Sequence, residues 1–181
     1  MVTGIDEEAV VARYGVTAGP DVALVLARAK AEDVAGRDSV HPGLVVGCDS
    51  VLELDGEVHG KPADAAEATA RWRRMRGRSG VLHTGHWVVD TRHPDSGGSG
   101  ATLGAVASTT VHFANLDDAE IDAYVGTGEP LRVAGAFTVD GLGGPYVRGV
   151  EGDHHAVVGI SLPLLRELLT ETGVPWRDLR R

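Results

Sequence analysis

Asp49 is the residue whose position suggests chemistry most clearly. It directly follows the apolar run from Leu44 to Cys48, which is typical of a buried strand. In open α/β sheets ligands bind beyond the carboxyl ends of the strands, where a carboxylate can bind a divalent cation or accept a proton from water. The alternative is an aspartate that only bonds to the backbone of its own turn. The sequence therefore indicates Asp49 as a candidate general base and metal ligand.

Two lysines are candidates for holding an anion. Lys30 shares the apolar face of a helix expected over residues 20–36. Lys61 lies in a loop before a helix whose start is indicated by Asp64 and Glu67, and a helix N-terminus adds positive partial charge. The alternatives are a lysine that buries only its stem, and an ordinary solvated loop lysine.

Other basic and nucleophilic residues give weaker indications. Five arginines within residues 71–78 could attract a polyphosphate, but at a helix C-terminus a solvated face explains them better. His83 and His86 have odd spacing on a strand, and His154 and His155 are adjacent, so neither pair favours one zinc ion. No serine lies in a nucleophile elbow, and the glycine-rich stretch lacks the dinucleotide fingerprint.

The elements that must position these residues alternate between strand-like and helix-like segments, which indicates an α/β fold. A hairpin is expected with its turn at Asp55-Gly56, and a surface loop at residues 93–100. Strands are expected at residues 44–46, 51–54, 57–59, 81–90 and 105–113, and helices beginning near Pro20, Asp64, Asp117 and Ser161.

Composition fits one globular domain over residues 1–181. Hydrophobic residues make up 43% of the chain and charged residues 24%, which excludes a disordered protein. A net charge of −9 argues against nonspecific binding to duplex nucleic acid. No apolar run approaches the ~20 residues of a membrane helix, and the acidic start does not match a secretory signal. With a single cysteine, Cys48, a reducing cytoplasmic setting is expected.

Seven short segments between residue 2 and about residue 170 match the motifs of one protein family in their order and spacing. They are residues 2–7, 26–31, 46–51, 56–62, 124–131, 134–141, and 151–153 leading to 157–160. In this order and spacing they resemble the Maf family, also called septum formation inhibitor Maf.

This resemblance implies a metal-dependent nucleoside triphosphate pyrophosphatase. The expected fold is inosine-triphosphatase-like, an α/β protein with a mixed twisted sheet flanked by helices. The expected reaction is the hydrolysis of canonical or modified nucleoside triphosphates to a monophosphate and pyrophosphate. The resemblance also implies a house-cleaning role, a link to cell-division arrest and a homodimer.

The resemblance assigns a role to each candidate residue. Asp49 is the proton acceptor that activates water, and Glu7 joins it in binding Mg²⁺ or Mn²⁺. Lys30 and Lys61 hold the triphosphate. Asp140 occupies a position where many relatives carry glutamine, so we expect it to contact the substrate and influence base choice. A triphosphate carries several negative charges, which lysines and a divalent cation must neutralise as pyrophosphate leaves.

Three features depart from the family pattern. Arg132 stands where aspartate is usual, and Gly80 replaces a common histidine. The family also begins with a strand and a Ser-x-Ser-x-Arg-Arg loop, and no such sequence occurs in these 181 residues. Two expectations follow from this third departure: either the start lies further upstream, or part of the phosphate site is lost. The second would make the chain a weak enzyme or a nucleotide-binding regulatory protein.

Overall fold

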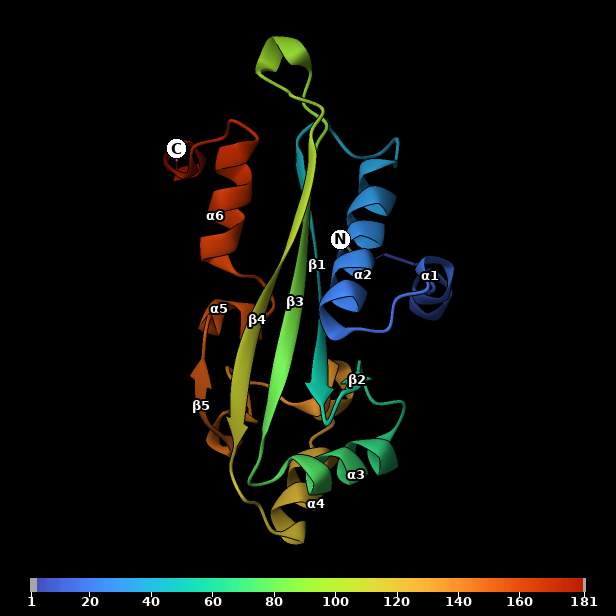
Figure 1. Cartoon of the computed structure of the whole chain (residues 1–181), viewed down its shortest axis with the longest axis vertical. Helices are drawn as coiled ribbons and strands as arrows, with labels where there is room; N and C mark the ends of the chain where they lie inside the picture. The colour runs from blue at the N-terminus through green and yellow to red at the C-terminus, as the bar shows by residue number, and fades with distance from the viewer. Residues whose placement is uncertain (1–2, 181) are drawn as a thin grey trace. The chain divides into compact units, whose positions relative to one another are not determined.

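A computed structural model describes residues 3–180 of the chain, which contain both helices and strands (Figure 1). The helices are α1 (Glu7–Tyr14), α2 (Gly19–Ala35), α3 (Ala65–Met75), α4 (Asp118–Gly126), α5 (His154–Val158) and α6 (Leu162–Glu171). The strands are β1 (Leu44–Leu54), β2 (Glu57–His59), β3 (Ser79–Asp90), β4 (Thr102–Phe113) and β5 (Val147–Glu151). No single helix among these residues is long and apolar enough to cross a membrane; α1 and α2 pass that test only when joined across a bend of 118°.

The strands form one sheet in the order β2-β1-β3-β4-β5. β1 pairs antiparallel with β2, with Leu54 opposite Glu57, and β4 pairs antiparallel with β5, with Val111 opposite Val150. Figure 1 shows β1, β3 and β4 alternating in direction. The α/β class with flanking helices is confirmed, but the described strands are antiparallel rather than mixed. Hairpin connections from β1 to β2 and from β3 to β4 make these two pairs antiparallel, because parallel neighbours need long crossovers.

Asp49 lies inside a strand and not at its end. The sequence predicted two short strands around it, whereas β1 runs without a break from Leu44 to Leu54. No glycine or proline follows Asp49 within β1, and the twelve residues of β3 are enough to pair along its whole length. The carboxylate therefore projects from a face of the sheet.

The described chain divides into two compact units. Unit 1 comprises residues 3–49, 84–107 and 160–180, and unit 2 comprises residues 50–83 and 108–159. The long strands contribute residues to both units, and each unit has its own hydrophobic core.

The core of unit 1 forms where α6 packs on β3. Leu165, Leu168 and Leu169 lie on one face of α6 and bury their side chains with Val88. Ser161 caps the helix by accepting a hydrogen bond from the backbone of Leu164 at 3.1 Å, as its sequence position predicted.

Trp72 is the centre of the core of unit 2. Its ring meets Phe113, Tyr124 and Tyr146 edge-on, with centroids 5.7, 5.5 and 6.0 Å away. Such edge-to-face contacts add to the burial of apolar area. The indole N–H donates to the Ala136 carbonyl at 2.7 Å, so no polar group of the ring stays unpaired. This contact fixes α3 against the segment that follows α4.

Asp90 closes the loop between β3 and β4. Its carboxylate accepts hydrogen bonds from the Arg92 guanidinium at 2.9 Å and from the backbone and hydroxyl of Ser99, both at 2.7 Å. The Arg92 guanidinium, helped by Ser99, holds the pKa of Asp90 well below its usual range. The Gly- and Ser-rich stretch is therefore a surface loop, as predicted, and hydrogen bonds to Asp90 hold its two ends together.

Candidate functional site

Helix α2 lies directly on the sheet because the contact residues are small. A Cβ on Gly47 of β1 would stand 2.3 Å from the Ala27 carbonyl and 2.9 Å from the Ala31 methyl. A Cβ on Gly85 of β3 would stand 2.3 Å from the Ala23 carbonyl. Ala23, Ala27 and Ala31 recur every four residues and form one face of the helix. This close packing sets the height of α2 above β1.

Lys30 lies between two carboxylates as a result. Its ammonium is 2.8 Å from Glu7 Oε1 and forms a hydrogen-bonded ion pair with Asp49 Oδ1. The side chains of Lys30 and Asp49 are only 21% and 11% exposed, whereas that of Glu7 is 47% exposed. Asp6 caps α1 by accepting from the Ala9 backbone at 3.0 Å, and this cap places Glu7 in the first turn. Three candidate residues thus converge in unit 1.

This arrangement keeps Lys30 charged and the neighbouring thiol neutral. Burial disfavours the ammonium form of Lys30, but hydrogen bonds with Asp49 and Glu7 outweigh it and raise the pKa above 10.5. Burial, with the charge of Asp49, raises the pKa of the Cys48 thiol to about 11. A neutral, partly buried thiol beside Asp49 is a poor nucleophile and a poor ligand for a hard cation.

Glu7 and Asp49 can supply two oxygen ligands to a divalent cation. Both already face one positive charge, the Lys30 ammonium, and Mg²⁺ is commonly held by one or two carboxylates together with substrate phosphates. Within residues 3–180 no group of three or more His, Cys, Asp and Glu side chains is placed to hold a metal ion. The two carboxylates therefore fit a cation that shares its coordination with substrate phosphates and water.

Lys61 lies in unit 2, exposed, in a loop that is tightly held on both sides. On one side the Gly60 carbonyl accepts from Arg71 at 2.6 Å and from the Gly135 backbone at 3.1 Å. On the other side Glu67 accepts from the Ala63 backbone at 2.8 Å. The Lys61 ammonium itself forms no ion pair or hydrogen bond with the described residues, so it is available to an anion in solution.

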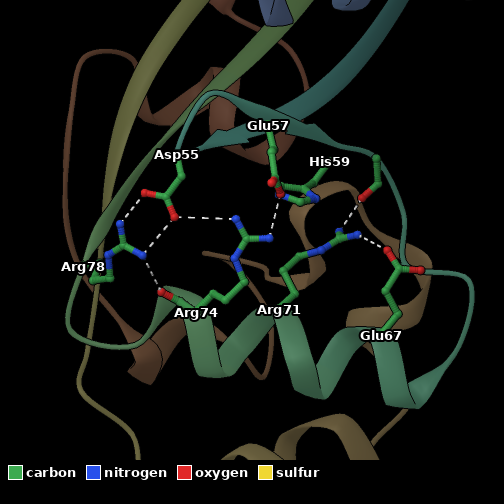
Figure 2. A network of polar contacts seen from close by, with 8 residues as sticks. Asp55, Glu57, His59, Glu67, Arg71, Arg74 and Arg78 are labelled. Carbon is green, nitrogen blue, oxygen red and sulfur yellow. Dashed lines mark hydrogen bonds and ion pairs between the residues drawn. The ribbon is translucent and has the colours of Figure 1, made fainter.

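Arg71 is the member of the arginine run that the solvated-face interpretation missed. It is 4% exposed and donates to the Gly60 carbonyl, and Figure 2 shows its ion pair with Glu67. Trp72 beside it enters the core. Its position four residues after Glu67 was a usable signal, because such a pair meets on one helix face.

The remaining arginines of the run match the prediction of a solvated surface. In the network of Figure 2, Arg74 pairs with Glu57 at 2.7 Å and Arg78 pairs with Asp55 at the β1–β2 turn. Their side chains are 41% and 48% exposed. Burial, followed by the charges of Arg71 and Arg74, lowers the pKa of the nearby His59. These arginines neutralise local acids.

Asp140 is exposed in a loop of unit 2 that is organised by Glu129, a residue the sequence analysis did not identify. Glu129 Oε1 accepts from the Tyr124 hydroxyl at 2.9 Å, the Thr138 hydroxyl at 2.6 Å and the Gly143 backbone at 2.9 Å. Its Oε2 accepts from the Leu142 backbone at 2.9 Å. Burial opposes the charged form, but these donors hold the pKa of Glu129 below its usual range. The sequence signal for this role of Glu129 was weak, because two of its four hydrogen-bond donors are backbone groups.

The histidines of β3 act in separate contacts. His83 Nδ1 is 2.8 Å from the Ser108 hydroxyl and its Nε2 is 3.3 Å from Glu53. In unit 1, the Thr84 carbonyl accepts from His86 Nδ1 at 3.0 Å, and Ser161 donates its backbone N–H to His86 Nε2 at 2.8 Å. His86 is therefore a neutral core residue that helps to hold the start of α6.

The chain is similar to known proteins over almost its whole length. The family described as Maf-like protein matches residues 1–172. A protein of Streptomyces coelicolor named nucleoside triphosphate pyrophosphatase is 56% identical over 179 residues, which cover 99% of this chain and 82% of that protein. A protein of the same name from Salinispora tropica is 54% identical over 97% of this chain and 74% of that protein. Another from Mycobacterium marinum is 48% identical over 96% of this chain and 82% of that protein.

Proposed function

We propose, from the premise that this chain belongs to the Maf family, that it hydrolyses nucleoside triphosphates to nucleoside monophosphates and pyrophosphate. Its relatives carry the name of this activity. The observation that carries the proposal is the convergence of Lys30, Asp49 and Glu7, on α2, β1 and α1, at a place where helix and strand are in backbone contact.

Asp49 is the proposed proton acceptor. One of its oxygens faces Lys30, and a carboxylate so placed can take a proton from a water molecule that attacks the α-phosphorus. The new bond joins the water oxygen to phosphorus, the bond to the bridging oxygen breaks, and pyrophosphate leaves. Lys30, held charged by its two partners, is well suited to neutralise phosphate oxygens as this charge develops.

Glu7 and Asp49 would also hold a divalent cation, Mg²⁺ or Mn²⁺. Their oxygens match the preference of these ions, and Lys30 keeps their mutual repulsion low before substrate binds. When bound, the cation would supply charge neutralisation for the triphosphate.

Lys61 and Asp140 are the further residues that we propose for substrate binding. Lys61 presents an exposed ammonium from a loop that is hydrogen-bonded on both sides, which suits phosphate oxygens. Asp140 presents only hydrogen-bond acceptors, which suits a base edge that carries donors. We further propose a single domain over residues 1–181, a homodimer, a cytoplasmic setting, and no binding to duplex nucleic acid or membrane. A role in cell-division arrest is proposed from the family alone.

The test compares the wild-type chain with Asp49→Asn and with Asp38→Asn, an exposed carboxylate outside the site. Pyrophosphate release from each of the common nucleoside triphosphates is measured with Mg²⁺ or Mn²⁺ present. We expect turnover by the wild-type chain and by Asp38→Asn, and a loss of about 10²–10⁴-fold in Asp49→Asn. Binding without pyrophosphate release by the wild-type chain would instead identify a nucleotide-binding regulatory protein.

A further inference from the structure

The loop that carries Asp140 packs closely against other groups at two glycines. A Cβ on Gly141 would stand 2.6 Å from Glu129 Oε2, and one on Gly143 would stand 2.3 Å from the Tyr124 hydroxyl. A Cβ on Gly143 would also stand 2.8 Å from the Thr138 carbonyl oxygen, which is backbone and cannot give way cheaply, whereas the atoms nearest to a Cβ on Gly141 are side-chain ends. The backbone of residues 138–143 is therefore wrapped closely around one carboxylate.

Only a carboxylate can accept all of these hydrogen bonds. Glu129 receives two hydroxyl and two backbone donors, and an ionised carboxylate has about four lone-pair sites and no hydrogen. A glutamine has the same shape, but its NH₂ group would face a donor. Replacing Glu129 by Gln thus removes acceptor capacity from the loop without creating a cavity.

Asp140 has no comparable contacts of its own. It is exposed, and its side chain forms no hydrogen bond or ion pair with residues 3–180. Thr138 lies two residues before it, and Leu142 two residues after it, and both bond to Glu129. The direction in which the Asp140 carboxylate points is therefore set by the backbone that Glu129 holds.

We propose that Glu129 is a positioning residue for base selection, which acts by fixing the loop of residues 138–143 so that the Asp140 carboxylate meets the base edge of the bound nucleotide. An acceptor-only side chain favours a base that presents an amino group, as cytosine does, over one that presents a keto oxygen at the same place, as uracil does. The favoured substrates are nucleoside triphosphates of amino-bearing bases. This inference rests on the proposed function.

The first measurement is hydrogen exchange at the Leu142 and Gly143 amides. In Glu129→Gln both amides should exchange about 10- to 100-fold faster, because each loses a bond to a charged acceptor. Glu120→Gln is the matched control, since Glu120 is another carboxylate of unit 2 that bonds only at the start of α4. Tyr124→Phe removes one donor and keeps the carboxylate, and should give a smaller increase. Unchanged exchange in Glu129→Gln overturns the inference.

The second measurement is the ratio of kcat/KM for CTP to that for UTP. It should exceed one in the wild-type chain and fall by about fivefold or more in Glu129→Gln, as it should in Asp140→Asn, whose amide can donate or accept. In the Asp140→Asn background, Glu129→Gln should change the ratio less than about twofold, because residues acting as a unit are not additive. An equal loss for both nucleotides, with the ratio unchanged, shows a purely structural role and overturns the inference.

A failure of the proposed function is recognised separately. If the wild-type chain releases no pyrophosphate from CTP or UTP, the pyrophosphatase proposal is wrong, and calorimetric binding of the two nucleotides then supplies the ratio. A binding ratio that falls in Glu129→Gln still supports the inference, and one that does not fall overturns it. Absence of binding to both nucleotides overturns both proposals.

Discussion

Replacing Arg71 by methionine should destabilise the protein far more than the same change at its exposed neighbour Arg73. Methionine keeps most of the buried stem but removes the charged hydrogen bond to the Gly60 carbonyl and the ion pair with Glu67. A hydrogen bond to a charged group is worth about 1.5–3 kcal/mol and a half-exposed ion pair about 0.2–1 kcal/mol. We therefore expect a loss of about 2–3 kcal/mol in the free energy of unfolding.

Thermal unfolding followed by circular dichroism measures this loss. For a chain of this size each kcal/mol lowers Tm by about 2–4 °C, so Arg71→Met should lower it by roughly 4–12 °C. Arg73 is 49% exposed and pairs with Asp118 at 3.2 Å, so Arg73→Met should change Tm little. Arg71→Met should also raise KM for nucleoside triphosphates, because Gly60 precedes Lys61. Equal Tm values for the two variants would refute the idea that Arg71 holds this loop.

Three further predictions concern the two lysines and the packing of α2. Lys30 has a pKa raised above 10.5, so its stabilising effect should be complete at neutral pH and lost as the pH rises through that raised value. The difference in urea stability between wild type and Lys30→Met should therefore shrink only at alkaline pH; a difference that already shrinks near neutral pH contradicts this. Lys61→Ala should weaken triphosphate binding by roughly 10- to 100-fold, and monophosphate binding less, by calorimetry; equal losses would place Lys61 away from the phosphates. Gly47→Ala should cost about 1–3 kcal/mol of stability in urea and lower activity, because its Cβ would lie 2.3 Å from the Ala27 carbonyl, whereas Gly43→Ala has room. If both glycine variants behave alike, close packing does not position Lys30.

Local sequence signals predicted the elements well where capping residues mark them. The capping pair Asp117 and Glu120, and the caps Asp64 and Ser161, begin helices in the structure as expected. Helix α1 was not predicted from the pattern of its residues, because none of them is buried. The strand ends around Asp49 were also wrong, since a tertiary neighbour and not local sequence decides how far β1 continues.

The candidate site was predictable only in part. The resemblance placed Glu7, Lys30 and Asp49 in one function, and the structure brings their side chains together. Arg71 and Glu129 were not predicted, because half of their partners are backbone groups that the fold brings to them. Residue type and spacing carry no information about a carbonyl or an amide eleven to fourteen positions away.

The closed base of the β3–β4 loop makes this loop a convenient point of attachment for engineering. Asp90 holds Arg92 and Ser99, so a change in the length of chain between them is not transmitted to the strands. The Ser96–Gly97 junction is the best insertion point, because Gly97 has open space around it, whereas a Cβ on the next residue, Gly98, would stand 1.9 Å from the Arg92 carbonyl. Lengthening a surface loop costs little entropy, about 0.6 kcal/mol for each doubling. A peptide tag or fluorescent reporter inserted there should leave the enzyme intact and free its termini for other uses.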